Sequence, residues 1–133
     1  MDQSSHADIH ADLNKGLPNI SECHWDITTA FDVLEHLENP TAILRKIPTN
    51  RLIISLPNVL SPFCRRLEKM ARLHLYSFTD YTAEALLTAA GWKIECLYFT
   101  FGKWSIISRC INIVGSLAPS FIGTGIMIHC RRK

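Results

Sequence analysis

The chain has 133 residues, of which 47% are hydrophobic and 20% are charged, a balance that suits one soluble globular domain with a hydrophobic core. The formal net charge of +2 is too small to indicate a nucleic-acid partner. Five widely spaced cysteines form no Cys-x-x-Cys pair, which argues against a disulfide framework or a zinc knuckle and favours a reducing cytoplasm.

The first part of the chain divides into an arm and the start of a domain. Residues 1–23 are mostly polar, and we expect them to form a loosely ordered N-terminal arm before a domain over residues 24–133. The segment HWDITTAF, residues 24–31, is β-branched and aromatic and predicts a short buried strand.

A helix and a second strand follow. Asn39 is a suitable N-cap and Pro40 suits the first helical position, so residues 38–47 predict a helix that ends before Pro48. The apolar run RLIISLPN, residues 51–58, predicts a strand buried on both faces.

The second half of the chain continues the alternation. Residues 62–73 predict a basic helix, whose cations suit either a solvated face or a substrate-phosphate or membrane-surface role. The next segment predicts a helix that packs through Ala85, Leu86, Ala89 and Ala90, stops at Gly91 and leads into a strand. Residues 103–117 predict an apolar helix and the chain closes on a strand, GTGIMIHCRRK. Strands that alternate with helices indicate a three-layer α/β sandwich.

One uncharged stretch, residues 110–130, is long enough to span a bilayer. Glycines, an asparagine and a proline interrupt it, and its last part alternates like a strand. We therefore expect no integral membrane segment.

The segment DVLEHLENP, residues 32–40, carries the most chemistry. If its start is a helical turn, then Asp32, Glu35 and His36 lie on one face, beyond the carboxyl end of the first strand, where open α/β sheets bind ligands. His74 is a natural fourth member if the loop after the second strand reaches the same opening. Such a cluster could bind a divalent ion or move a proton. Acids near a helix start also have a purely structural role, and that alternative stays open.

These segments together resemble the class I S-adenosylmethionine-dependent methyltransferases, nearest to the ubiquinone-biosynthesis O-methyltransferases. The resemblance rests on ADLNKGLP, on Leu34-Glu35-His36 followed by Asn39-Pro40, on Leu56-Pro57-Asn58 and on His74. It covers residues 11 to about 100, and the final strand more loosely. It implies an incomplete Rossmann-like sandwich, whose strands correspond to the fourth to seventh of a seven-stranded sheet, the last one antiparallel.

The resemblance also implies roles for single residues. Asp12 and Leu13 would lie against the adenine of S-adenosylmethionine. The lip beside the methionine portion of the cofactor would be formed by Thr29, Ala30 and Phe31. A divalent metal would be held by the acidic and histidine positions, which are Asp32, Glu35, His36 and His74. Glu35, His36 and His74 are the candidate catalytic residues, with His36 or His74 as the base. Tyr76, Phe78, Trp104 and the helix over residues 103–117 would wall the acceptor pocket.

One family feature is missing from these 133 residues. Members bind the cofactor through a Gly-x-Gly-x-Gly loop after their first strand, and the first glycine here is Gly16, within NKGLP. The sequence therefore predicts that the chain begins about halfway through the domain, with Asp12 on a fragment of the third strand. The strand at residues 24–31 would then have an open edge.

Two main functional hypotheses follow, besides a third in which the chain associates with a membrane through residues 104–128. In the first, the chain transfers a methyl group to a small or lipid-linked acceptor once the missing half is supplied. In the second, it is a non-catalytic remnant that binds a protein partner or a second copy of itself through the open edge of residues 24–31.

Overall fold

The computed structural model describes residues 9–18, 25–62, 64, 74–100, 120 and 123–133. The helix predicted over 103–117 and nearly all of that predicted over 62–73 lie outside the described residues. The described elements, in chain order, are η1 (Leu13–Lys15), β1 (Thr28–Phe31), η2 (Leu34–His36), α1 (Pro40–Lys46), β2 (Arg51–Pro57), α3 (Asp80–Ala89), β3 (Trp92–Thr100) and β4 (Gly125–Arg132); η denotes a 3-10 helix.

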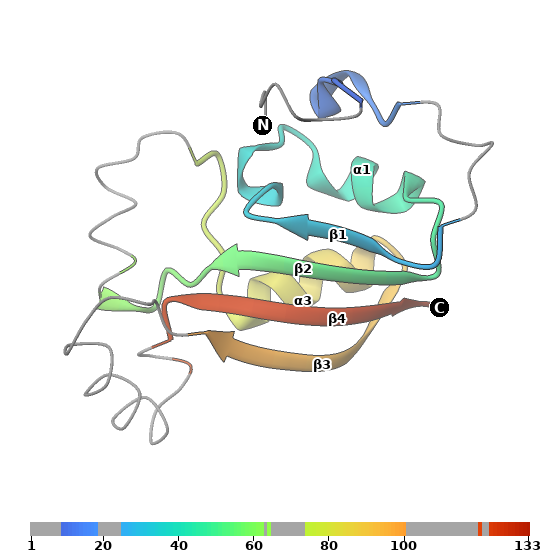
Figure 1. Ribbon diagram of the computed structural model, residues 1–133. Helices are drawn as coiled ribbons and strands as arrows, with labels where there is room; N and C mark the ends of the chain where they lie inside the picture. The colour runs from blue at the N-terminus through green and yellow to red at the C-terminus, as the bar shows by residue number, and fades with distance from the viewer. Residues whose placement is uncertain (1–8, 19–24, 63, 65–73, 101–119, 121–122) are drawn as a thin grey trace.

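The four strands form one open sheet in the order β1-β2-β4-β3 (Figure 1). β1 and β2 are parallel, whereas β4 runs antiparallel to both of its neighbours. This is a mixed α/β arrangement with an antiparallel last strand, which confirms the predicted fold class and the orientation of the closing strand.

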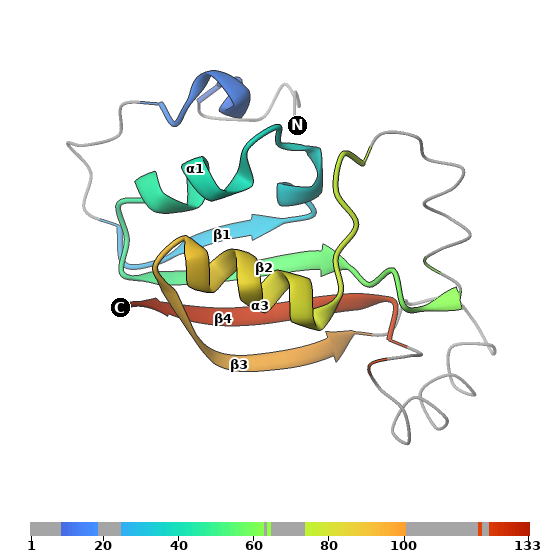
Figure 2. The ribbon, with the colours of Figure 1, turned by 180° about the vertical axis from the view of Figure 1, so that it is seen from behind.

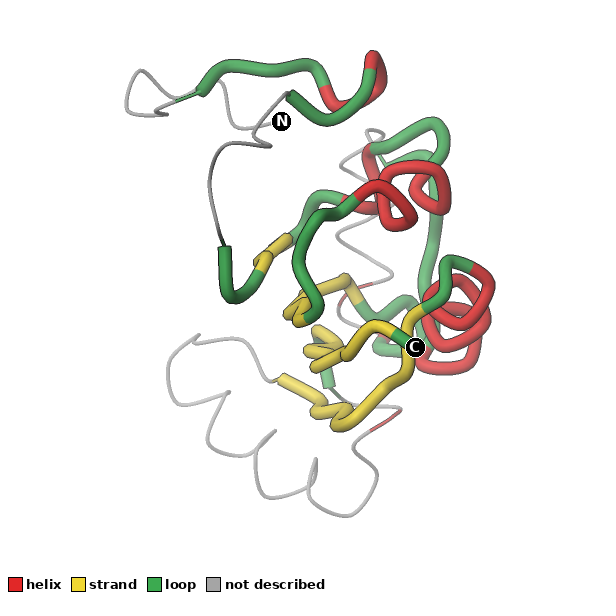
Figure 3. The backbone as a smooth tube through the Cα atoms, turned by 90° about the vertical axis from the view of Figure 1, so that its right-hand side faces the viewer, coloured by secondary structure: helices red, strands yellow, loops and turns green. Residues whose placement is uncertain are grey.

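The helices α1 and α3 lie on the same face of the sheet (Figures 2 and 3). The described residues therefore form two of the three predicted layers. The core lies between α1, α3 and the inward positions of the strands, and its largest fully buried apolar side chains are Leu34, Leu37, Leu44, Leu52, Ile54, Leu56, Leu87, Trp92, Ile126 and Ile128.

The start of α1 follows the sequence prediction. Asn39 is the N-cap, its side-chain oxygen accepts a hydrogen bond from the Ala42 amide at 3.0 Å, and Pro40 is the first helical residue. At the other end of α1, the Leu44 carbonyl accepts from the Trp92 indole at 3.0 Å, and the Ile47 carbonyl accepts from the Arg132 guanidinium, which also lies over the Trp92 ring. Side chains from β3 and β4 thus satisfy the carbonyls at the end of a helix that lacks a glycine cap.

The end of α3 is also as predicted, but its packing face is not. Gly91 has a φ of 88°, the left-handed conformation expected after a helix end. The buried positions near or within α3 are Ala83, Leu87 and Ala90, whereas Ala85 and Ala89 are exposed. The predicted face was therefore wrong for two of its four residues.

The two parallel strands are less buried than the sequence predicts. In β2, Leu52, Ile54 and Leu56 are buried, but the alternate side chains are only half-buried or exposed. In β1, Thr29 and Phe31 are exposed, so the prediction of a buried strand is wrong. The reason is that the described helices cover a single face, and β1 pairs on one side only, with β2.

The long uncharged stretch forms part of β4 in its described portion. None of the helices in the described part of the chain has the length and the apolar run needed to cross a bilayer.

Candidate functional site

The site begins where β1 ends, at a backbone turn made by Asp32. Asp32 has a φ of 51°, a left-handed conformation that aspartate adopts more readily than most residues. Its amide donates to the Ser55 carbonyl of β2 at 3.2 Å, and its carboxylate accepts from the Ser55 hydroxyl at 3.0 Å. Asp32 is therefore not part of a helical turn with Glu35 and His36, because η2 starts only after it.

Glu35 is buried because the leucines near it in η2 and at the end of η2 are part of the core. Leu34 and Leu37 pack in the core on either side, and Glu35 itself is 0% exposed. Neither of its carboxylate oxygens has a hydrogen-bond partner in the structure. Burial raises the pKa of this carboxyl group and the nearby Asp32 charge adds to the rise, while the polar backbone of Glu35 itself, His36 and His74 oppose it. An unpaired buried carboxylate is unfavourable unless a cation or a proton accompanies it.

The segment before α3 is tied to the same turn through the backbone. The Glu35 carbonyl accepts from the Leu75 amide at 2.8 Å and from the Tyr76 amide at 3.3 Å. This places His74 beside His36, with ring centroids 4.8 Å apart and an interplanar angle of 72°. Both segments lie at the end of the sheet to which the arrowheads of β1 and β2 point (Figure 1), the ligand-binding edge of open α/β sheets.

Glu35, His36 and His74 form a set of potential metal ligands. Each offers one ligand atom, and these atoms lie within 4.8 Å of one another. One carboxylate and two imidazoles suit borderline divalent ions such as Zn²⁺, Fe²⁺, Mn²⁺ or Co²⁺. The unpartnered Glu35 carboxylate fits this interpretation, because a bound cation would supply the missing counter-charge. Asp32, the fourth ligand that the sequence predicts, lies outside this set and is bonded to Ser55.

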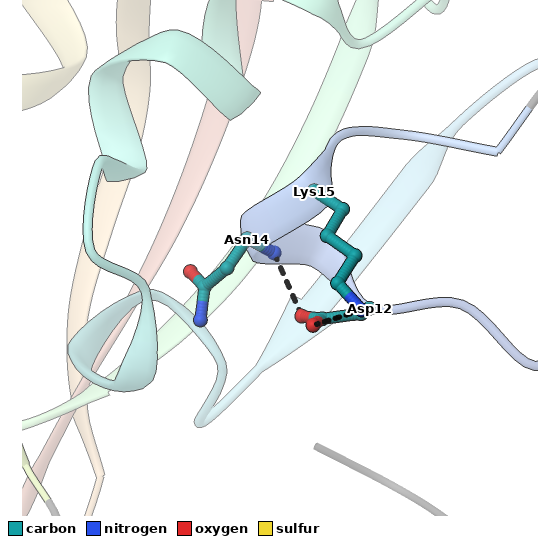
Figure 4. Close-up of polar contacts among 3 residues, drawn as sticks. All are labelled: Asp12, Asn14 and Lys15. Carbon is teal, nitrogen blue, oxygen red and sulfur yellow. Dashed lines mark hydrogen bonds and ion pairs between the residues drawn. The ribbon is translucent and has the colours of Figure 1, made fainter.

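The residues predicted to contact adenine lie at the start of η1 rather than on a strand, with Asp12 as its N-cap and Leu13 as its first residue. The Asp12 carboxylate accepts from the Asn14 amide at 3.1 Å and forms an ion pair with Lys15 at 3.7 Å (Figure 4). The prediction of a third-strand fragment at Asp12 is therefore wrong. The physical reason is that a side chain which caps the following turn favours that turn over an extended strand. Leu13 packs against the core together with Leu17, so the described part of the N-terminal segment is attached to the domain.

The residues predicted to form the methionine lip lie on β1, an edge strand of the sheet formed by the described residues. Thr29 and Phe31 are exposed, whereas the alternate residue Ala30 packs against the core. The exposed side chains are available to a ligand, and their role in binding a cofactor stays a prediction.

The predicted acceptor wall is only partly within the described residues. Phe78 belongs to the core, and Tyr76 stacks against it with ring centroids 6.2 Å apart. Trp104 and the helix over 103–117 lie outside the described residues.

Sequence reasoning missed Ser55 and Asn14. Ser55 donates a hydrogen bond to the Asp32 carboxylate, and Asn14 accepts one from the Glu38 amide. Neither position carries a recognisable local motif.

Comparisons with known proteins identify the fold. No protein-family model and no curated protein sequence matches the chain. Among solved structures, the chain is similar to a SAM-dependent methyltransferase from Archaeoglobus fulgidus, with a TM-score of 0.62 and 16% identity over 93% of this chain and 66% of that one. It is also similar to the small RNA methyltransferase HEN1, with a TM-score of 0.56 and 20% identity over 81% of this chain and 14% of that one.

A third similar structure is magnesium protoporphyrin IX methyltransferase (ChlM) from Synechocystis PCC 6803 with bound SAH, with a TM-score of 0.55 and 17% identity over 92% of this chain and 49% of that one. The chain thus spans between about one seventh and two thirds of the length of these three proteins. Its described part has, in partial form, the Rossmann-like fold of the SAM-dependent methyltransferases.

Proposed function

We propose that the chain takes part in methyl transfer from S-adenosylmethionine to a small or lipid-linked acceptor. The observation that carries this proposal is the buried, unpartnered Glu35 carboxylate, which lies with His36 and His74 at the ligand-binding edge of a methyltransferase-type sheet. We propose an acceptor hydroxyl as the first class to test, because the sequence motifs resemble those of the ubiquinone-biosynthesis O-methyltransferases.

The proposed reaction is a displacement at carbon. A lone pair on the acceptor oxygen forms a bond to the methyl carbon, the bond from that carbon to sulfur breaks, and sulfur keeps the electron pair as a neutral thioether. The acceptor proton passes to a base, for which His36 and His74 are the candidates because both are only half-buried. Positioning and exclusion of water account for most of the acceleration in such a step.

A metal fits the same residues. Glu35, His36 and His74 would hold it, and a bound divalent ion lowers the pKa of a hydroxyl group that contacts it. Without a metal, the Glu35 carboxylate has no hydrogen-bond partner. The neighbouring imidazoles of His36 and His74 only partly offset the rise in its pKa that burial causes.

For the cofactor, we propose contacts from Asp12, Leu13, Thr29, Ala30 and Phe31. The exposed side chains at the end of β1 support this proposal. The glycine-rich loop is absent from these 133 residues. We therefore propose that a further polypeptide segment, paired to the free edge of β1, supplies it.

Two titrations of the purified chain test the proposal. Co²⁺ binding, followed by visible absorption, is expected for the wild type and is expected to be lost in Glu35→Gln. Glu84→Gln, which changes an exposed carboxylate of α3, is the matched control and should bind like the wild type. Calorimetric titration with S-adenosylhomocysteine then reports the cofactor half of the site.

The outcomes separate the parts of the proposal. Binding of both probes supports methyl transfer and would overturn the proposed need for a further segment. Binding of Co²⁺ without S-adenosylhomocysteine supports an acceptor-side half that needs a further segment. Failure to bind Co²⁺, or equal binding by Glu35→Gln, would overturn the metal assignment, and failure of both titrations would overturn methyl transfer as well.

A second function is supported by the edge of the sheet. Within the described residues β1 pairs only with β2, and Trp25, Ile27 and Phe31 are exposed in or just before it. An unpaired edge with apolar side chains favours strand addition by another polypeptide. In this alternative the chain is a non-catalytic interaction module, and its affinity for Co²⁺ would be incidental.

A further inference from the structure

Three separate segments meet at the backbone of Glu38. The Glu38 amide donates to the Asn14 side-chain oxygen at 3.0 Å, and the Glu38 carbonyl accepts from the Tyr76 hydroxyl at 2.9 Å. Asn14 belongs to η1, Glu38 follows η2, and Tyr76 lies in the connection that leads to α3. The chain therefore joins its N-terminal segment to two segments of the candidate site at one residue.

The Tyr76 bond is the second of two links between the segments that carry the histidines. The first is the backbone link in which the Glu35 carbonyl accepts from the amides of Leu75 and Tyr76. One link lies just before His36 in the sequence and the other lies two residues after it. With one link on each side of His36, the segment that carries His36 cannot easily slide or rotate against the segment that carries His74. The links therefore restrict the spacing between the two imidazole rings.

The Tyr76 ring is itself held in place. It stacks on Phe78 at 6.2 Å with an interplanar angle of 27°, and Phe78 is part of the core. The Tyr76 side chain remains 41% exposed, so water could satisfy its hydroxyl group if the bond to Glu38 were absent. The bond is therefore expected to contribute little to global stability and more to the relative position of the two segments.

We propose that Tyr76 is a positioning residue that sets the spacing of His36 and His74, and that Asn14 extends the same link to the segment carrying Asp12 and Leu13. This inference rests on the proposed function, since it assigns these two residues to the support of that site. Ligand-supporting bonds of this kind tune metal affinity by about tenfold or more when they hold the ligands directly. Tyr76 acts one step further away, and we expect about a fivefold effect.

The test is a Co²⁺ titration of the full 133-residue chain, with the visible absorption bands as the readout. We expect Tyr76→Phe to weaken Co²⁺ binding by about fivefold and to change the position or intensity of the bands, because one hydrogen bond that orients the ligands is lost. Tyr81→Phe is the matched control. Its ring is 78% exposed and its hydroxyl group makes no hydrogen bond within the described residues, so wild-type affinity and bands are expected.

The role of Asn14 is tested in the same way. Asn14→Ala removes the acceptor for the Glu38 amide and is expected to weaken Co²⁺ binding by about twofold to fivefold. Asn14→Asp keeps an acceptor oxygen and should bind Co²⁺ within about twofold of the wild type. Because Asn14 and Tyr76 act on the same residue, the effects of Asn14→Ala and Tyr76→Phe should not be additive in the double variant.

Several results would overturn the inference. Identical affinity and bands for Tyr76→Phe and the wild type would show that the hydroxyl group does not position the ligands. Equal losses in Tyr76→Phe and Tyr81→Phe would show a general effect of removing a tyrosine hydroxyl. Absence of Co²⁺ binding by the wild type would overturn the metal assignment and this inference with it, whereas the first two results leave the metal assignment intact.

Discussion

The rings of His36 and His74 meet in a T-shaped, edge-to-face contact at a centroid distance of 4.8 Å, although the two residues follow different strands of the sheet. Their contact depends on the Glu35 carbonyl, which accepts two amides from the segment that begins at His74. The cluster is thus a product of the parallel pairing of β1 and β2, since that pairing brings the ends of both strands to one edge.

Glu35→Gln is expected to stabilise the metal-free protein while it removes metal binding. When Glu35 is ionised, the wild type buries a carboxylate with no hydrogen-bond partner, and a neutral amide in the same space is less unfavourable by about 1 to 3 kcal/mol. Chemical denaturation in the presence of a chelator measures the difference. A Glu35→Gln variant less stable than the wild type would show that the carboxylate is satisfied in the metal-free protein.

The same comparison should depend on pH in a defined direction. Burial raises the pKa of Glu35 in the folded state above its usual value of 4.5. Below that value both states are protonated and the burial of charge costs nothing, whereas at higher pH folding requires either proton uptake or a buried charge. The stability advantage of Glu35→Gln should therefore grow as pH rises above 4.5, up to the folded-state pKa of Glu35. A constant difference across this range would contradict the assignment.

Asp32→Asn is expected to leave metal affinity nearly unchanged. The Asp32 carboxylate accepts from Ser55 and lies outside the set formed by Glu35, His36 and His74. Asparagine keeps an acceptor oxygen and tolerates the left-handed backbone. We expect the affinity for Co²⁺ to stay within about threefold of the wild type. A loss as large as that of Glu35→Gln would make Asp32 a ligand after all.

The free edge of β1 should drive concentration-dependent association. Ile27 is exposed just before β1, and a lysine there places a charge on the edge where a second strand would add. Sedimentation velocity is expected to show less self-association for Ile27→Lys than for the wild type. Tyr81→Lys, an equally drastic change on α3, should have no such effect. A wild type that stays monomeric at all accessible concentrations would refute self-pairing through this edge.

The buried thiol of Cys130 is expected to make the folded protein less stable in alkaline solution. Burial, with a smaller contribution from the Glu95 charge, raises the pKa of its thiol to about 12 from an ordinary value of 9.0. The unfolded thiol ionises first, so stability from this group is constant below about pH 9 and falls as pH rises toward 12. At pH 10 the loss is about 1 kcal/mol. Under reducing conditions, Cys130→Val should show a shallower fall, and parallel curves would contradict the prediction.

The elements that the sequence predicted well are those fixed by local chemistry. Asn39 and Pro40 define the start of α1, and Gly91 defines the end of α3, because capping and left-handed turns depend on a few adjacent residues. The packing face of α3 was misassigned because its buried and exposed alanines are chemically identical. The sequence alone does not distinguish the buried Ala83 from the exposed Ala85 and Ala89. Only contact with the sheet decides which of them is covered.

The same division applies to the site. The spacing of Glu35, His36 and His74 could be noticed in the sequence, since these residue types are common metal ligands and general bases. The absence of a partner for the Glu35 carboxylate and the bond from Tyr76 to Glu38 could not, because both depend on how distant segments meet. Asp32 was misplaced for a related reason, since its bond to Ser55 arises only when β1 and β2 pair.

The position of β4 has a consequence for how the protein folds. β4 lies between β2 and β3, and in the described sheet β3 pairs with β4 alone. β1, α1 and β2 can associate early through short connections, but β3 has no strand to join until a segment much later in the sequence inserts beside β2. Contacts of such long sequence separation slow folding and leave strand edges open in the meantime. The rate of sheet closure is therefore expected to be set by β4, the last of the described strands in chain order.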